Sequence, residues 1–262
     1  MSYKRIISRI DVKGENLVKG INLEGLKILG KPWEFSNYYY KKKIDEIVFF
    51  DTVASLYGRN NLFDIVEKVS KNIFIPISVG GGIRSLEDIS KLLNAGADKI
   101  ILNTKALKDP KFINTAVNKF GSSTIMVNID FNLQPNNSYS CFIENGRQIF
   151  NKNILKWIKE IQKRGAGEII LTSIARDGTG EGFDMTFYKQ IKNLIKIPLI
   201  LSGGFGSINQ IYNVIKNEDV DAVSIASMFH YDKIKDKNFK GQTLSPINLK
   251  KNLIKKNIKC RM

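Results

Sequence analysis

Short runs of β-branched and aromatic residues alternate along the chain with longer segments in which apolar residues recur every three or four positions. The short runs predict buried strands and the longer segments predict amphipathic helices. Eight strands are predicted, at residues 6–12, 46–51, 75–79, 99–103, 124–130, 168–173, 197–201 and 222–227. Helix-like segments lie between them, for example at residues 62–72, 85–95, 154–164 and 207–217.

Eight strand-then-helix units in 262 residues without a Pro/Ser-rich linker are typical of an α/β fold, the (β/α)8 TIM barrel. We therefore expect a single domain over residues 1–262. A doubly wound open sheet is the competing fold. An internal repeat argues against it: the segments that start at residues 45 and 76 resemble those that start at 167 and 198, an offset of 122 in both cases. The repeat predicts two half-barrels, about 1–120 and 121–262.

Glycine-rich turns follow the third and seventh predicted strands. Gly80–Gly82 and Gly203-Gly204 occupy equivalent places in the repeat. Each turn is followed one strand later by a pair of small residues, Asn103-Thr104 after the first and Ala226-Ser227 after the second. Because glycine lets the backbone approach a ligand and backbone amides bind phosphate, we expect two phosphate sites at one barrel mouth.

Two aspartates also occupy related places, Asp11 at the end of the first strand and Asp130 at the end of the fifth. The carboxyl ends of the strands form the mouth of such a barrel, where chemistry occurs. Paired carboxylates suit general acid/base catalysis if their environments separate their pKa values.

Weaker candidates surround these residues. Lys19 lies on an expected polar loop that could cover an anionic substrate, and Asp177 and Gly178 lie on a loop at the same mouth. We expect His230, which follows the eighth strand, to be a packed or capping residue. The run 41–43 of three lysines reads as a solvated helix end.

The charge of the chain is unusual. Lys and Arg number 41 against 25 Asp and Glu, which gives a formal net charge of +16 and raises the prospect of a polyanionic partner. Half of this excess lies in residues 232–262. We expect residues 245–257 to form a closing helix with Ser245 as N-cap, Pro246 first and the lysines on the solvated face.

Other classes are disfavoured by composition. Two cysteines and one histidine are too few for a disulfide framework or a multi-histidine metal site, so we expect no metal and no cofactor. No apolar run approaches the ~18 residues that span a bilayer, and charges interrupt residues 1–11. We expect a soluble, cytoplasmic protein without nucleic-acid or membrane partners.

The motifs together resemble one family, the cyclase subunit of imidazole glycerol phosphate synthase in histidine biosynthesis. The resemblance runs from about residue 5 to 261. It rests on DVK and VKG within 11–20, FFDTVAS (49–55), VGGGI (79–83), GADKIILNT (96–104), RGAGEIILTSIARDGT (164–179) and SGG (202–204).

The resemblance implies a carbon-nitrogen lyase that accepts ammonia from a glutaminase subunit. Its substrate would be a bisphosphorylated ribulosyl formimino-aminoimidazole carboxamide nucleotide, converted to imidazole glycerol phosphate and aminoimidazole carboxamide ribotide. Asp11 and Asp130 would be catalytic. Substrate and phosphate would be bound by Lys19, Asp51, Gly82, Asn103, Thr104, Asp177, Gly178, Gly204, Ala226 and Ser227.

The resemblance also implies a route for ammonia from the opposite, bottom face of the barrel. Ammonia would pass a charged ring of Arg5, Glu46, Lys99 and Glu168, and Asp98 would contact the glutaminase. Arg9 departs from the family, which usually has cysteine there. Because strand side chains alternate, Arg9 should point into the barrel between the ring and Asp11. It should have a buried partner there, and if that partner is Asp11 the pKa of the acid falls.

Two further departures, Phe150-Asn151 and the GRNN stretch at 58–61, leave an alternative open. The chain could be a cyclase-like paralogue that delivers glutamine-derived ammonia to another acceptor, such as a surface sugar being amidated. A barrel that has lost catalysis and binds nucleic acid is a third possibility. Retention of both aspartates and both glycine turns argues against this last reading, as does the lack of aromatic residues among the lysine clusters.

Overall fold

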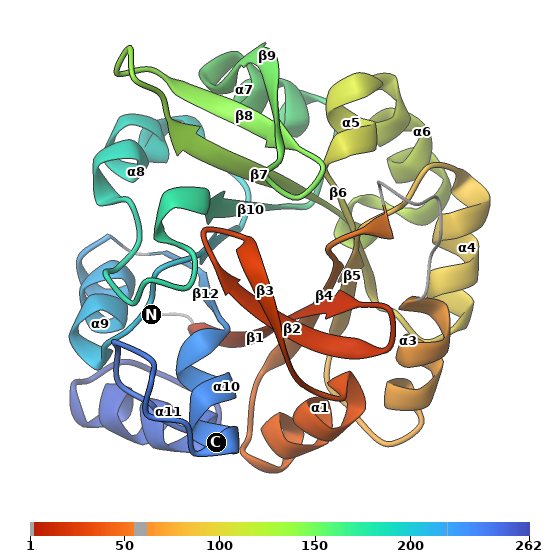
Figure 1. Cartoon of the computed structure of the whole chain (residues 1–262). Helices are drawn as coiled ribbons and strands as arrows, with labels where there is room; N and C mark the ends of the chain where they lie inside the picture. Colours follow the sequence, from red (N-terminus) through yellow and green to blue (C-terminus); the bar gives the residue numbers. More distant parts are fainter. Residues whose placement is uncertain (1–2, 55–61, 219) are drawn as a thin grey trace.

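The computed structural model describes residues 3–54, 62–218 and 220–262, so the stretch 58–61 lies outside the described residues. Eight parallel strands form a closed ring in the order β1, β4, β5, β6, β7, β10, β11 and β12, and β12 pairs with β1 (Figure 1). Their bounds are β1 (Arg5–Lys13), β4 (Glu46–Asp51), β5 (Ile77–Gly80), β6 (Lys99–Leu102), β7 (Ile125–Leu133), β10 (Glu168–Ser173), β11 (Leu199–Ser202) and β12 (Ala222–Ile225). The predicted (β/α)8 barrel and its eight strands are confirmed. Closure by the β7–β10 pairing excludes the open sheet.

Helices surround this ring (Figure 1). They are α1 (Pro32–Lys41), α3 (Leu62–Ser70), α4 (Leu86–Asn94), α5 (Thr104–Lys108), α6 (Lys111–Phe120), α7 (Ile154–Lys163), α8 (Met185–Ile191), α9 (Ile208–Asn217), α10 (Ser227–Ile234) and α11 (Pro246–Lys255). Helices α4 and α9 each begin with a capping box, built on Ser85 with Asp88 and on Ser207 with Gln210. These caps fix where two of the predicted helices start. The twofold repeat and the half-barrel boundaries stay predictions.

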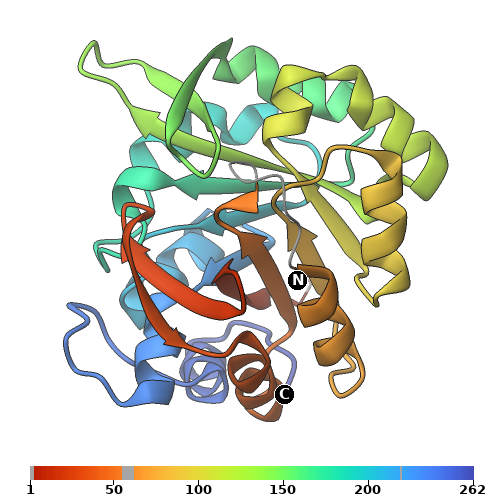
Figure 2. The same cartoon turned by 45° about the vertical axis from the view of Figure 1, so that its right-hand side comes forward.

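Two β-hairpins were not predicted. β2 (Asn16–Ile21) pairs with β1 and with β3 (Glu24–Gly30), while β8 (Tyr139–Ile143) pairs with β7 and with β9 (Gln148–Asn153). Figure 2 shows both hairpins on the same side of the barrel, where the strands end. The expected polar loop around Lys19 is therefore wrong: Lys19 lies on β2. The hairpins escaped prediction because β3 and β9 have no fully buried position and no alternating apolar pattern.

Side chains that point into the barrel form layers. In β1 these are Arg5, Ile7, Arg9 and Asp11, as strand alternation predicts. An apolar cluster above the bottom end contains Ile7 with Val48, Phe50, Ile101, Met126, Ile170, Ile200 and Ala222. The larger core lies between the strands and the helices, and it contains Trp157, Phe35 and Phe187 among its largest members. The barrel interior is thus a packed column, with charged layers at its two ends.

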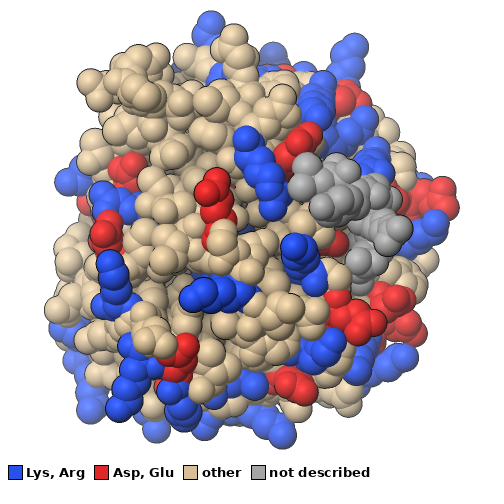
Figure 3. All heavy atoms as spheres, in the orientation of Figure 1, with Lys and Arg blue, Asp and Glu red and all other residues tan. Residues whose placement is uncertain are grey.

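The basic C-terminal segment folds as expected in outline. α11 begins at Pro246 after Ser245, which occupies the N-cap position without a side-chain capping bond. Figure 3 shows Lys and Arg side chains along the edge where Figure 1 places α11. One expectation fails: Lys250 is not solvated but buried, with its Nζ 2.6 Å from Asp45 Oδ1. Within the described ranges, no helix has the length and apolar character needed to cross a membrane.

Candidate active site

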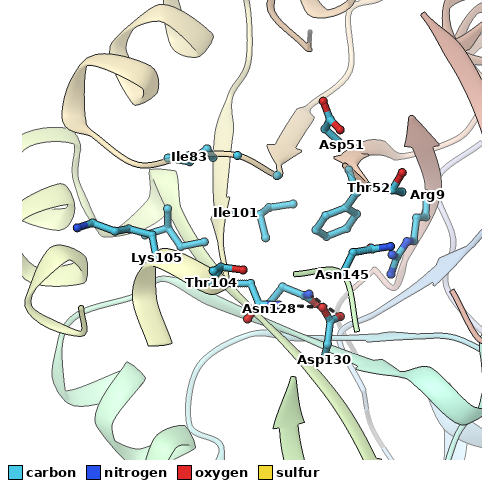
Figure 4. A pocket seen from close by; sticks show the side chains of 15 residues that line it. Arg9, Asp51, Thr52, Ile83, Ile101, Thr104, Lys105, Asn128, Asp130 and Asn145 are labelled. Carbon is cyan, nitrogen blue, oxygen red and sulfur yellow. Dashed lines mark hydrogen bonds between the residues drawn. The ribbon is translucent and has the colours of Figure 1, made fainter. Parts of the chain in front are cut away.

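Two pockets open at the ends of the barrel strands, on either side of Arg9, which lines both. The β5 pocket is lined by Asp51, Gly82, Asn103, Thr104 and Asp130 among others, and Figure 4 shows how several of them face it. The β11 pocket is lined by Lys19, Asp177, Gly178, Gly204, Ala226 and Ser227 among others. Every residue expected to bind substrate therefore lines one of two pockets.

The glycine turns hold the backbone of each pocket close to the preceding strand. Gly81 has a φ of +102°, and an added Cβ would lie 2.5 Å from the carbonyl oxygen of Asp51. Gly203 has a φ of +97°, and its Cβ would lie 2.7 Å from the carbonyl oxygen of Ser173. Any side chain at either position would displace the neighbouring strand end, so both pocket walls require glycine.

Asp11 and Asp130 lie on β1 and β7, which are opposite strands of the ring, and both are buried. Asp11 Oδ1 accepts a hydrogen bond of 2.8 Å from Arg9 Nε, and Lys19 Nζ lies 3.7 Å from its Oδ2. Burial alone would raise the pKa of Asp11. The charges of Arg9 and Lys19, together with the Arg9 hydrogen bond, outweigh burial and lower it. The predicted buried partner of Arg9 is therefore Asp11, as the sequence allowed.

Asp130 has a different environment. Its Oδ1 accepts a hydrogen bond of 2.8 Å from Asn128 Nδ2, which Figure 4 shows. Its Oδ2 accepts a hydrogen bond of 2.8 Å from Asn103 Nδ2. Burial raises the pKa of Asp130 to about 6, against the charge of Arg9 and the Asn128 hydrogen bond, which lower it. The two aspartates thus have pKa values displaced in opposite directions, which is the separation that paired acid/base catalysis requires.

Lys19 and His230 complete the surroundings of Asp11. Lys19 is buried and forms an ion pair with Asp177, so it closes the β2 hairpin against the loop after β10. The ring of His230 is buried, and its Nδ1 lies 2.5 Å from the Tyr39 hydroxyl. Burial lowers the pKa of His230 to about 3, so the imidazole is neutral at physiological pH. His230 is the packed residue that the sequence predicted.

The four residues of the predicted charged ring come together at the amino-terminal end of the strands. Arg5 forms ion pairs with Glu46, at 2.9 Å, and with Glu168. Lys99 Nζ lies 3.0 Å from Glu168 and 3.9 Å from Glu46. The two cations and two carboxylates therefore alternate around the barrel axis. Asp98, the residue before Lys99 of this ring, is exposed, and its Oδ2 accepts a hydrogen bond of 2.8 Å from the backbone N–H of Ile77.

The amino-acid sequence of the chain is similar to those of known proteins. Residues 5–235 match the family described as histidine biosynthesis protein. The chain belongs to this family. An imidazole glycerol phosphate synthase subunit HisF of Legionella pneumophila is 45% identical over 210 residues, covering 80% of this chain and 99% of the relative. Relatives with the same name from Helicobacter hepaticus and Sulfurisphaera tokodaii are 44% and 43% identical, each covering 90% of this chain and 94% and 93% of the relative.

Three polar side chains at the barrel mouth were not predicted from the sequence: Asn128, Thr172 and Ser202. Asn128 holds Asp130, Thr172 Oγ1 donates 2.9 Å to Asn128 Oδ1, and Ser202 Oγ lies 3.4 Å from Arg9 Nη1. A signal was present for Asn128, which stands two residues before Asp130 as Arg9 stands two residues before Asp11. The same strand alternation that placed Arg9 inside the barrel also predicts Asn128 there.

Proposed function

We propose that this chain is the cyclase that joins ammonia to the bisphosphorylated ribulosyl formimino-aminoimidazole carboxamide nucleotide, with Asp11 and Asp130 as its acid/base pair. The products are imidazole glycerol phosphate and aminoimidazole carboxamide ribotide. The observation that carries the proposal is the pair of oppositely shifted aspartates between two glycine-walled pockets. The identity of 41–45% to relatives named as this synthase subunit supports it.

The two aspartates suit opposite roles. A nitrogen that forms a bond to carbon must lose a proton, and a leaving nitrogen or water must gain one. Asp11, held ionised by Arg9 and Lys19, is the group that accepts a proton. Asp130, whose pKa is about 6, retains its proton on a fraction of molecules near neutral pH and is the group that donates.

A substrate with two phosphates fits the two pockets. The β5 pocket offers the backbone of Gly82 and the start of α5 at Thr104, and the β11 pocket offers Gly204 and the start of α10 at Ser227. Backbone N–H groups in such places bind phosphate without a neutralising side chain. One phosphate in each pocket would stretch the substrate across Arg9 and between the two aspartates.

Substitution of each aspartate tests these roles. We expect Asp11→Asn and Asp130→Asn each to lower kcat with ammonium by roughly 10²–10⁴-fold, because each removes one proton-transfer group. Turnover is measured from product formation at saturating nucleotide. Asp64→Asn, an exposed aspartate on α3, is the matched control and should leave kcat unchanged. Full activity in either variant would exclude that aspartate from the reaction.

We further propose a glutaminase subunit as the partner on the bottom face, with Asp98 at the contact and ammonia passing the charged ring. Asp98→Ala is expected to lower turnover that depends on glutamine and the glutaminase subunit, while turnover with free ammonium stays as in the wild type. Equal effects on the two rates would mean that Asp98 acts on the barrel itself, through its bond to Ile77, rather than on the partner.

A further inference from the structure

Arg9 occupies the centre of the barrel mouth. Its side chain leaves β1 and is 2% exposed. Nε donates 2.8 Å to Asp11 Oδ1, and Nη1 lies 3.2 Å from Thr172 Oγ1 and 3.4 Å from Ser202 Oγ. Cζ lies 4.5 Å from the centre of the Phe50 ring. The guanidinium therefore spans the barrel from β1 to β10 and β11, and it is held on several sides.

A chain of hydrogen bonds leads from Arg9 to the second aspartate. A guanidinium can only donate, so Thr172 Oγ1 must accept from Arg9 and use its own hydrogen toward Asn128 Oδ1, at 2.9 Å. The amide nitrogen of Asn128 is then turned to Asp130 Oδ1, at 2.8 Å. Every bond in this relay runs outward from Arg9. The direction of each donor is fixed by the cation at its start.

The two aspartates thus receive the charge of Arg9 in different ways. Asp11 forms a direct, buried ion pair with Arg9, while Asp130 feels the charge from a distance and is joined to Arg9 by hydrogen bonds only through the neutral side chains of Thr172 and Asn128. A direct pair favours the ionised carboxylate much more than a neutral relay does. Resting on the acid/base roles proposed above, we propose that Arg9 is a positioning residue that selects Asp11 as the ionised member of the pair and fixes the orientation of Asp130.

The other cation near Asp11 is Lys19, whose charge also lowers the pKa of Asp11, but less than the charge of Arg9 does. Lys19 is closer to Asp177, its ion-pair partner, than to Asp11, from which its Nζ lies 3.7 Å. Asp177 carries a negative charge that Asp130 and Arg9 both sense. His230 is held neutral by burial. The directions of the two pKa shifts agree with the proposal, since the one below the usual range belongs to the directly paired aspartate.

Titration of the two carboxyl groups tests the proposal without turnover. In the whole chain labelled with ¹³C at aspartate Cγ, the Asp11 and Asp130 signals are assigned by their loss in Asp11→Asn and Asp130→Asn. In the wild type we expect Asp130 to titrate near pH 6 and Asp11 at a lower pH. Arg9→Gln should raise the midpoint of Asp11 by about one pH unit or more, a tenfold change in proton affinity. Asn128→Ala should raise the titration midpoint of Asp130 and leave the midpoint of Asp11 unchanged.

Two results would overturn the proposal: a folded Arg9→Gln variant in which Asp11 titrates as in the wild type, or a wild type in which Asp11 titrates above Asp130. Should Arg9→Gln fail to fold, Arg9→Lys replaces it. The lysine keeps the positive charge, so Asp11 must still titrate at a lower pH than Asp130. If Asp130 titrates at the lower pH in this variant, the charge at position 9 does not select Asp11 as the ionised aspartate. Absence of cyclase turnover in the wild type would refute the proposed function while leaving this titration to decide the role of Arg9.

Discussion

Asp11 and Asp130 are the same residue type, are buried to nearly the same extent, and still differ in which form they favour. The difference comes from the neighbours of each carboxyl group, which are cations for Asp11 and amides for Asp130. Arg9 faces Asp11 directly, whereas Asp130 accepts its two hydrogen bonds from amides. At the scale of single residues, the side chains two positions before each aspartate, Arg9 and Asn128, therefore contribute to the difference between them.

Burial of Asp130 has a cost in stability that can be measured. In the unfolded chain its carboxyl group ionises near pH 4, but in the folded chain it holds its proton until about pH 6. Because the folded state binds more protons, this group makes stability fall as pH rises from about 4 to 6. Above pH 6 the full penalty applies, up to ~3 kcal/mol.

We therefore expect Asp130→Asn to be more stable than the wild type at pH 8, by about 1–3 kcal/mol, and the gain to vanish near pH 4. Urea unfolding of both proteins at the two pH values measures the difference. Asp64→Asn, which alters an exposed carboxylate, should show no such dependence. A gain that is equal at pH 4 and pH 8 would mean that the ionised carboxylate carries no burial penalty.

The sequence predicts where a side chain points only where a local rule, such as the alternation of side chains along a strand, applies. Strand alternation placed Arg9 inside the barrel and would have placed Asn128 there as well. Lys19 could not be placed, because its burial depends on an ion pair with Asp177, distant in sequence. The split in pKa between the aspartates also depends on such contacts, since the charges of Arg9 and Asp177, both distant in sequence, act on Asp130.

At the scale of elements, all eight buried barrel strands were predicted, and two of them with their exact bounds. β4 and β10 have only buried positions, and their predicted ranges agree with the observed ones. Hairpin strand β3 has mostly exposed positions, so its pattern resembles that of a loop. The lysines of α11 were assigned to solvent because lysine is rarely buried without a partner. The partner of Lys250 is Asp45, which lies far away in the sequence.

The Lys250–Asp45 pair joins the last helix to the base of the barrel. Lys250 Nζ also donates to the carbonyl oxygen of Lys43, and Asp45 Oδ2 accepts from the backbone N–H of Ile6. Lys250→Ala leaves a buried carboxylate unpaired, and we expect it to lower the free energy of unfolding by roughly 3–5 kcal/mol. Thermal or urea unfolding gives the value.

Lys251→Ala removes the exposed neighbour of Lys250 and should change stability by less than about 0.5 kcal/mol. Similar losses in the two variants would show that the helix responds to lysine removal in general and not to the buried pair.

At the scale of the whole molecule, the count of strand and helix units was enough to predict the barrel, and the topology then brought the strand ends together at one mouth. Half of the net charge of +16 lies in the basic C-terminal segment, whereas the buried cations of the mouth, Arg9 and Lys19, are paired with carboxylates and add no net charge. Figure 3 shows acidic side chains among the basic ones on the face that carries the hairpins. The excess charge therefore does not come from the mouth.

The claim that this barrel closes an imidazole ring with ammonia is tested most directly by following the nitrogen atom. The purified chain is incubated with the bisphosphorylated nucleotide and ¹⁵N-labelled ammonium, and the products are identified by mass and NMR. We predict ¹⁵N in the ring of imidazole glycerol phosphate, formed in equal amount with unlabelled aminoimidazole carboxamide ribotide. An unconsumed nucleotide, or consumption without ¹⁵N in an imidazole ring, would contradict the account.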